Sequence, residues 1–301
     1  MECQLRLGTY NRDWLTKYFE QMRNTVFNDE QSRRISVQLC NGTHAITITY
    51  DFDQCAWRLI NASSSQLVSE KNIAAEVLRA FGSGETFNRN RYAVFMAAII
   101  GLDAESPMLK ARAEDLVQWN NDYLHRHRND IVTMVPERQI SILYTAAYYG
   151  NLEIVALFAG EKSLISLVTE EGWTPLVVAI TRGHKEAAKC LIEHGIDVNY
   201  RKNNDSATPL MRCIEHGDEE TAKVLLSRDD IDLNLTIKFS KDKLMEYAKT
   251  NNIPAERIDE FIKLSNTVTI TALKYAEAKG CKSIVALIHE AESRASMRHR
   301  N

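Results

Sequence analysis

The chain has 301 residues, of which 45% are hydrophobic and 26% are charged, and its formal net charge is −3 at pH 7. This length allows two domains, and the small negative charge argues against a global basic field for nucleic acid. No apolar run is long enough to cross a bilayer, and the N-terminal residues lack the pattern of a secretory signal peptide. The six cysteines are scattered, which favours reduced thiols in a cytoplasmic protein and predicts neither a metal site nor a cofactor.

The first hundred residues are predicted to form an α+β domain, in which flanking helices accompany an antiparallel meander. Apolar residues at helical spacing indicate helices, and alternating apolar residues indicate strands. Asn41-Gly42 between two strand-like runs is typical of a tight hairpin. The expected segments are a helix over 11–30, strands over 34–40, 43–50 and 55–61, a helix over 69–81, and a run over 91–100 that fits a strand or a helix.

Two polar residues fall on the apolar face of this predicted sheet. If the turn between the second and third strands pairs Tyr50 with Cys55, the register sets His44 directly opposite Asn61, with Cβ atoms ~5 Å apart. An imidazole held by a neighbouring amide is the base and orienting part of a nucleophilic triad. The same arrangement also fits a hydrogen-bonded polar pair in a sheet without catalysis.

The strands around His44 carry a resemblance to a known family. The runs His-Ala-Ile-Thr-Ile, Tyr-Asp and Trp-x-Leu-Ile-Asn-Ala resemble the C-terminal half of papain-like cysteine proteases. More narrowly, residues 11–100 are similar to protease-like domains of type IV secretion effectors from Legionella-type bacteria. The resemblance implies that His44 is the general base, that Asn61 orients it, and that the chain is a bacterial effector secreted into the cytoplasm of a host cell.

The nucleophile of such a protease is not evident in this chain. Papain-like folds place the cysteine on a helix well upstream of the histidine, whereas little chain precedes His44. Cys3 is the only upstream cysteine outside the adjacent strand, and no apolar helical run surrounds it. The domain is therefore interpreted as degenerate or truncated, and His44 and Asn61 as the candidate remnant of a catalytic site.

The second half of the chain repeats itself with a period of about 33 residues. Thr208-Pro209-Leu210 repeats Thr174-Pro175-Leu176 after 34 residues. In each copy the threonine hydroxyl is expected to cap a helix, the proline to occupy its first turn, and a later glycine to end it. These glycines are Gly183 and Gly217, and Gly150 and Gly280 end two further units, which begin at Ser141 and Thr271. The pattern resembles ankyrin repeats, which implies an all-α solenoid of stacked helix pairs.

The predicted organisation therefore has four parts. The third and fourth repeats are separated by about 30 residues more than one period, which indicates an insertion at a repeat junction. The parts are a cysteine-protease-like domain over 1–101, a linker helix over 102–137, about four ankyrin repeats over 138–292 with a helical insertion over 236–266, and a basic tail over 293–301.

The ankyrin resemblance also implies where a partner binds. In these repeats the residue before the Thr-Pro-Leu turn and the two residues before the helix-ending glycine line the concave face. The candidate partner-binding residues are Tyr148, Tyr149, Trp173, Arg182, Glu215 and His216. Large amphipathic side chains of this kind are typical of binding hot spots. Alternatively, Tyr148 and Trp173 pack beneath the N-terminal domain or the linker helix.

We interpret the protein as an interaction scaffold that binds a host protein through its concave face, without catalysis. The alternative is a papain-like cysteine peptidase or acyl transferase that uses His44 and Asn61 with a cysteine not evident in this chain. A thiol-reactive activity probe distinguishes these classes, because an interaction module does not label at any one cysteine. The sequence names neither the partner nor the oligomeric state.

Overall fold

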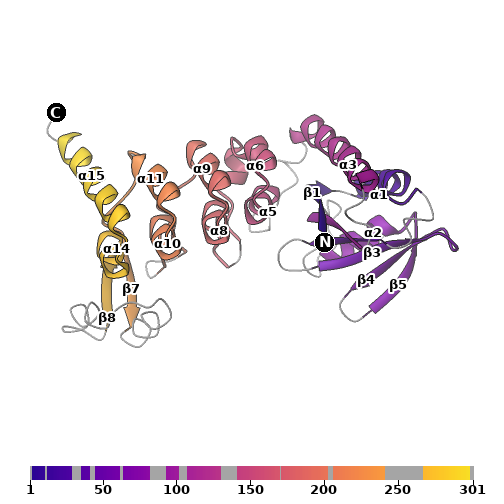
Figure 1. Ribbon diagram of the computed structural model, residues 1–301, viewed down its shortest axis with the longest axis horizontal. Helices are drawn as coiled ribbons and strands as arrows, with labels where there is room; N and C mark the ends of the chain where they lie inside the picture. Colours follow the sequence, from indigo (N-terminus) through magenta and orange to yellow (C-terminus); the bar gives the residue numbers. More distant parts are fainter. Residues whose placement is uncertain are drawn as a thin grey trace. The chain divides into compact units, whose positions relative to one another are not determined.

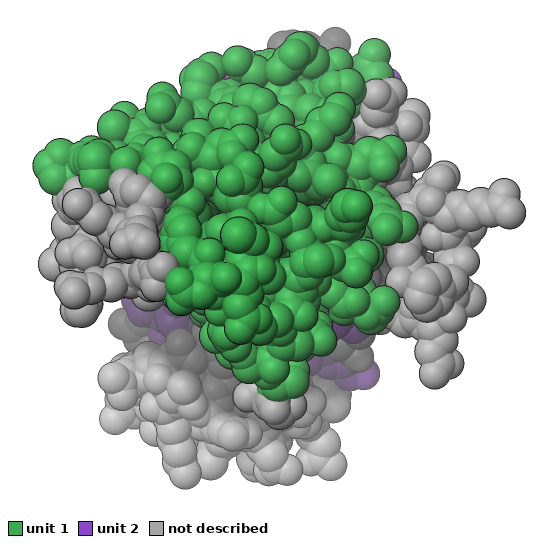
Figure 2. All heavy atoms as spheres, turned by 90° about the vertical axis from the view of Figure 1, so that its right-hand side faces the viewer, with its two compact units in different colours: residues 1–146 green, residues 147–301 purple. Residues whose placement is uncertain are grey.

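The computed structural model divides the chain into two compact units, residues 1–146 and 147–301. Figure 1 shows a sheet with accompanying helices in the first unit and a row of paired helices in the second, and Figure 2 colours the two units separately. The structure describes residues 2–10, 12–28, 35–40, 45–61, 64–81, 93–101, 107–129, 141–169, 171–202, 206–240 and 267–298.

The first unit contains a six-stranded sheet with the strand order β1-β6-β2-β3-β4-β5, and all neighbouring strands are antiparallel. The strands are β1 Glu2–Tyr10, β2 Ile35–Cys40, β3 Ala45–Asp51, β4 Ala56–Asn61, β5 Ser64–Ser69 and β6 Ala93–Gly101. The predicted meander is confirmed for β2, β3 and β4, and the apolar run over 91–100 is a strand. The prediction missed the two edge strands, β1 and β5.

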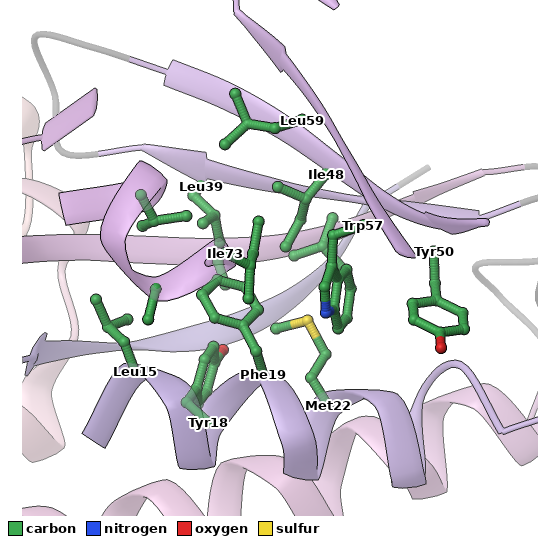
Figure 3. Packing of buried hydrophobic residues seen from close by; sticks show 14 of the residues in the cluster. Leu15, Tyr18, Phe19, Met22, Leu39, Ile48, Tyr50, Trp57, Leu59 and Ile73 are labelled. Atoms are coloured by element: carbon green, nitrogen blue, oxygen red, sulfur yellow. The ribbon is translucent and has the colours of Figure 1, made fainter. Parts of the chain in front are cut away.

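One face of this sheet is covered by helices. Along β3, Ile46, Ile48 and Tyr50 are buried, whereas the residues between them are partly exposed. The alternation means that one side of the strand faces a core and the other side faces outward. Figure 3 shows Phe19 and Met22 extending from helix α1 (Arg12–Thr25) toward the buried side chains of the sheet.

Trp57 on β4 lies at the centre of this core. Its side chain is 1% exposed, and its ring meets those of Phe19 and Phe27 edge-on, with ring centroids 5.4 and 5.5 Å apart. Helix α2 (Ile73–Phe81) adds Ile73, which is labelled in Figure 3, to the same cluster, and Val77 also belongs to it. Large aromatic rings of this kind supply much of the apolar area that a small domain buries.

Helix α3 (Pro107–Arg126) also belongs to the core of the first unit. It lies within the segment 102–137 that was predicted as a linker helix. Ala113 and Leu116 are buried in the cluster, and the ring centroid of Trp119 lies 5.4 Å from that of Trp14 on α1. The segment therefore contributes packing to the sheet unit in addition to connecting it to the repeats.

The register of the β3–β4 hairpin differs by two residues from the predicted one. Tyr50 pairs with Trp57, and Asn61 pairs with Ile46. The predicted opposition of Asn61 and His44 is therefore wrong, and His44 itself lies outside the described residues. Because side chains alternate with a period of two, a shift of two residues keeps Asn61 on its predicted face.

The cause of the shift is the turn that joins these strands. The last pair is Asp51 with Ala56, so four residues form the turn. The backbone N–H of Gln54 donates to Asp51 Oδ1 at 3.1 Å, and Cys55 adopts a left-handed backbone with a φ of 47°. Arg58 Nη2 also pairs with Asp51 Oδ2 at 3.0 Å. The hydrogen bonds that Arg58 and Gln54 donate to the Asp51 carboxylate lower its pKa.

The second unit is a row of helix pairs, shown in Figure 1, and the first helix of the row, α5, begins within the first unit. First helices α8, α10 and α14 stack on one another in turn, and second helices α9, α11 and α15 do the same. The pairs are α5 Ile142–Tyr149 with α6 Leu152–Phe158, α8 Pro175–Arg182 with α9 Lys185–Glu193, α10 Pro209–His216 with α11 Glu219–Ser227, and α14 Ala272–Lys279 with α15 Lys282–Arg298. A short helix, α7 (Lys162–Ile165), follows the first pair.

The caps of the first helices form as predicted. Thr174 Oγ1 accepts a hydrogen bond from Val177 N at 3.2 Å, and Thr208 Oγ1 accepts one from Met211 N at the same distance. The same bond from Lys274 N to Thr271 Oγ1 measures 3.4 Å. These bonds satisfy backbone donors that no helix can satisfy internally, so each repeat fixes its own helix start.

Two segments of the second unit differ from their predictions. Residues Thr236–Ser240 form strand β7, which pairs antiparallel with β8 (Thr267–Thr271). The start of the insertion predicted as helical over 236–266 is therefore a strand, as the β-branched Thr236 and Ile237 and the aromatic Phe239 favour, and 241–266 lie outside the described residues. Helix α15 runs to Arg298, so most of the predicted basic tail is helical, because good helix formers continue the segment.

Candidate protein-binding surface

The structure brings predicted partner-binding residues together where consecutive repeats meet. We call the side formed by the ends of the first helices and the turns before them the inner surface. Its members are Tyr148, Tyr149, Trp173, Arg182, Arg212, Glu215, His216 and Lys279. Arg182 and His216 are exposed, and the other members are partly buried.

Tyr148, Tyr149 and Arg182 form one group on the inner surface. The guanidinium carbon of Arg182 lies 4.0 Å from the centroid of the Tyr148 ring, and the same side chain donates a hydrogen bond to the Tyr148 hydroxyl. The Tyr148 and Tyr149 rings meet edge-on, with centroids 4.9 Å apart. The cation–π and ring contacts hold three large side chains in a defined arrangement at the ends of α5 and α8.

His184 fixes the backbone beneath this group. Its Nε2–H donates to the carbonyl oxygen of Tyr148 at 3.0 Å, and because a carbonyl only accepts, Nε2 carries the proton. Gly150 makes room for the imidazole, since a Cβ at this position would lie 2.4 Å from His184 Nδ1. The φ of Gly150 is also +69°, a conformation that side-chain-bearing residues rarely adopt.

Trp173 forms a second group with the following repeat. The guanidinium carbon of Arg212 lies 6.0 Å from the centroid of the Trp173 ring, and Arg212 Nη1 donates to Glu215 Oε2 at 2.7 Å. The Trp173 backbone is held by Thr169, whose hydroxyl accepts from Trp173 N at 3.2 Å and whose N–H donates to Trp173 O at 3.0 Å. The tryptophan is therefore presented from a turn with a fixed backbone.

The fourth helix pair continues the inner surface. Lys279 Nζ donates to the carbonyl oxygen of Glu215 at 3.2 Å, which joins α14 to the end of α10. Arg182, Arg212 and Lys279 thus each contact the preceding repeat. The predicted His216 lies beside Glu215 in the sequence and is exposed.

Sequence reasoning missed three residues of this arrangement, namely His184, Arg212 and Lys279. The period itself gives a signal for Lys279, because it precedes Gly280 as Arg182 precedes Gly183. Arg212 has a weaker local signal, since it lies three residues before Glu215 on the same helix. Its contact with Trp173 joins two separate repeats, so the spacing of residues within one helix could not predict it.

The outer helices α9 and α11 arrange their charges differently. Lys185 and Lys189 both reach Glu220 at 2.9 Å, and Lys189 also reaches Glu186 at 2.9 Å. Hydrogen bonds from Lys189 and Lys185 lower the pKa of Glu220 to about 2. On this side, lysines and carboxylates offset one another across the repeat junction.

The candidate catalytic pair in the first unit cannot be assembled from the described residues. Asn61 ends β4 and is partly buried, whereas His44 lies outside the described residues. Cys55 lies at the other end of β4 from Asn61, roughly 20 Å away at ~3.3 Å per residue. Among the described residues, no group of three or more side chains is arranged to hold a metal ion.

Comparisons with known proteins concern the second unit. Residues 143–237 match the family of ankyrin repeats, in three copies. Similar segments occur in the mouse Ankyrin repeat and SAM domain-containing protein 6 (30% identical over 93 residues, 31% of this chain and 10% of that protein) and in the human Transient receptor potential cation channel subfamily A member 1 (31% over 118 residues, 38% and 10%). Another occurs in the Schizosaccharomyces pombe Ankyrin repeat-containing protein P1E11.10 (32% over 71 residues, 24% and 34%).

The chain thus spans only a tenth to a third of the length of these relatives. In the part of the chain that the structure describes, no helix is long and apolar enough to cross a membrane. The matched segment coincides with the helix pairs whose caps and glycines recur at the predicted spacing. Residues 143–237 are ankyrin repeats, an architecture that supports a protein–protein interaction role.

Proposed function

We propose that this protein is an interaction scaffold that binds another protein through the inner surface of its ankyrin repeats. The observation that carries the proposal is the pair of aromatic–cation groups, Tyr148 with Arg182 and Trp173 with Arg212. Rings that are already held by neighbouring repeats lose little conformational entropy when a partner covers them. Aromatic and arginine side chains that are held in this way are typical centres of protein interfaces.

The finer proposal is that the partner is a host protein and that the chain is a secreted bacterial effector. Its support is the resemblance of residues 11–100 to protease-like domains of type IV secretion effectors. The alternative class is a thiol hydrolase that uses His44 and Asn61, and it requires a nucleophile within hydrogen-bond reach of the imidazole. The thiol-reactive probe described above tests that alternative.

A double variant of the inner surface tests the interaction proposal. A photo-crosslinking residue placed at Tyr149 or Trp173 of the full chain should capture a defined partner from a host-cell extract. In a pull-down of the partner so identified, the Tyr149→Ala, Trp173→Ala variant without the cross-linker should no longer bind it, while keeping its melting temperature. The matched control Glu193→Ala, Lys223→Ala changes two exposed residues of the outer helices and should bind that partner unchanged.

Two results would contradict this proposal. Equal cross-linking from Tyr149 and from the control position Glu193 would show that the inner surface has no selective partner. A melting temperature lowered by several degrees, as roughly 1–2 kcal/mol of lost packing causes, together with intact capture, would show that the aromatic residues serve the fold.

A further inference from the structure

The two edges of the six-stranded sheet differ in how they are protected. Strand β1 carries the charged residues Glu2 and Arg6, and helix α3 contacts it. Its register with β6 also shifts between Leu5 and Gly8. Natural sheets use such charges, irregularities and covering elements to keep an edge from pairing with another chain. Among the described residues, the opposite edge, β5, has none of these three protections.

Strand β5 is regular, uncharged and exposed. Its six residues pair with β4 in one unbroken register, and in the part of the chain that the structure describes it is the last strand of the sheet (Figure 1). It contains no proline, and all its residues except Val68 are exposed. Because backbone groups alternate in an antiparallel ladder, every second residue of β5 directs its N–H and C=O away from β4. This edge can therefore accept a further strand.

Two exposed apolar side chains lie beside this edge. Leu67 on β5 is 40% exposed, and Ile60 on β4 is 41% exposed. Ile60 pairs with Ser65, which is two residues from Leu67, so both apolar side chains lie on one face of the sheet. This is the outer face, because the buried Val68 lies on the other side of β5. The open edge is thus next to an apolar strip.

Strand β5 is complementary to a second copy of itself. When two β5 strands pair antiparallel about a two-fold axis through Gln66, Leu67 of one copy lies opposite Ser65 of the other. The small serine leaves room for the leucine, which can extend across it toward Ile60 of that copy. On the axis, Gln66 meets Gln66 of the other copy. An amide both donates and accepts hydrogen bonds, whereas a charged residue there would repel its own copy.

Other axis positions fit less well. An axis through Leu67 would place two leucines opposite each other and leave Ile60 uncovered. An axis between two residues would place each side chain opposite one from the other face, because side chains alternate with a period of two. The axis through Gln66 keeps the outer faces of both copies on one side and covers the apolar strip of each.

We propose that two copies of this chain pair through β5 about a two-fold axis at Gln66, which joins their sheets into one continuous sheet. The assembly closes at two copies, because each copy uses its β5 edge once and β1 is protected. Six residues are few for a protein interface, so the dimer forms reversibly and its population depends on concentration. This inference goes beyond the proposed function, since a dimer offers a partner two inner surfaces.

The first test measures the oligomeric state of the full chain by sedimentation velocity. The chain should shift from monomer to dimer as its concentration rises. Leu67→Lys places a charge in the apolar strip and should raise the dissociation constant of the dimer at least tenfold. The matched control Met108→Lys makes the same kind of change at a 48% exposed side chain on α3 and should stay within twofold. If circular dichroism shows that Leu67→Lys is unfolded, Ser65→Arg provides the same comparison.

A second test locates the axis by cross-linking with oxidised glutathione. Gln66→Cys places the two new thiols opposite each other and should give a disulfide-linked dimer on a non-reducing gel. Ser64→Cys is the matched control on the same face. It pairs with Val68 of the other copy, so its two thiols lie roughly 13 Å apart at ~3.3 Å per residue, beyond the reach of a disulfide. The unmodified chain gives the background from its own cysteines.

Four results would overturn this inference. The first is a chain that stays monomeric at every concentration, and the second is one that grows into larger oligomers without limit. The third is equal weakening of the dimer by Leu67→Lys and Met108→Lys, which would place the interface away from β5. The fourth is equal cross-linking of Gln66→Cys and Ser64→Cys, which would contradict the axis at Gln66.

Discussion

The two units reach their folds through contacts of very different sequence separation. In the first unit, β1 pairs with β6, so that Glu2 lies opposite Ile100. In the second unit, helix caps join residues three apart, and contacts such as Arg182 with Tyr148 join neighbouring repeats. A sheet assembled from distant strands depends on one shared core, whereas a repeat array distributes its stability over similar neighbouring interfaces.

The largest expected effect that sharpens this comparison comes from Trp57→Ala. This change removes the central ring of the first unit and should cost about 3–5 kcal/mol. Because the repeats have their own core, their helices should remain folded while the first unit unfolds. A denaturant titration should then show two separate transitions. Tryptophan fluorescence reports mainly on the first unit, and circular dichroism at the helix signal reports on the repeats.

The control for this prediction is Leu67→Ala, because Leu67 is 40% exposed on the edge strand of the same sheet. Its loss should shift the first transition only slightly. If Trp57→Ala gave a single transition, in which the fluorescence and circular dichroism signals change together, the two units would unfold as one. The contrast between a shared core and independent repeats would then be wrong.

A smaller effect is expected from Gly150→Ala, which tests the interface between two repeats. The added Cβ needs a left-handed backbone and also meets the His184 ring, so the change should cost roughly 1–3 kcal/mol. Gly183→Ala is the matched control: its φ is +77° but no atom lies within 4 Å of the new Cβ, so it should cost about 1 kcal/mol. Equal losses in thermal unfolding would mean that the His184 contact contributes nothing.

The smallest effect is expected at the charged side of the outer helices. The folded-state pKa of Glu220 is lowered to about 2 from a model-compound value of 4.5, so its stabilising contribution is present above pH 4.5 and is lost as the pH falls toward 2. Glu220→Gln should therefore flatten the pH dependence of the repeat transition in this window. The difference should be small and should vanish at high salt, because the group is exposed. A difference that survives high salt would argue against this assignment.

The same contrast explains what the sequence could predict. The helix starts at Thr174 and Thr208 depend on residues within one turn, so their spacing alone located them. The strand β5 was missed because its serines give no alternating apolar pattern, and only Val68 among its residues is buried. The β3–β4 register depends on the four-residue turn, in which Cys55 adopts a left-handed backbone. This conformation could not be predicted, because cysteine has no preference for it.

The candidate surface shows the same limit. The period placed Tyr148, Tyr149, Trp173 and Arg182 on one side of the array, and the structure brings them into contact groups. Which cation reaches which ring depends on the stacking of consecutive repeats, so the spacing of residues within one helix could not predict the contact between Arg212 and Trp173. The predicted role of these residues in partner binding remains a prediction.

The β7–β8 ribbon gives the array a place where its length can change. Ser240 and Thr267 are paired, so the two ends of the intervening segment lie about 5 Å apart, the usual spacing of neighbouring strands. Helices α10 and α14 stack on each other, as do α11 and α15, although this segment separates the two repeats in the sequence. The segment between β7 and β8 can therefore be lengthened, shortened or replaced by another segment whose ends lie close together. Neither evolution nor a protein engineer would disturb the repeats on either side by doing so.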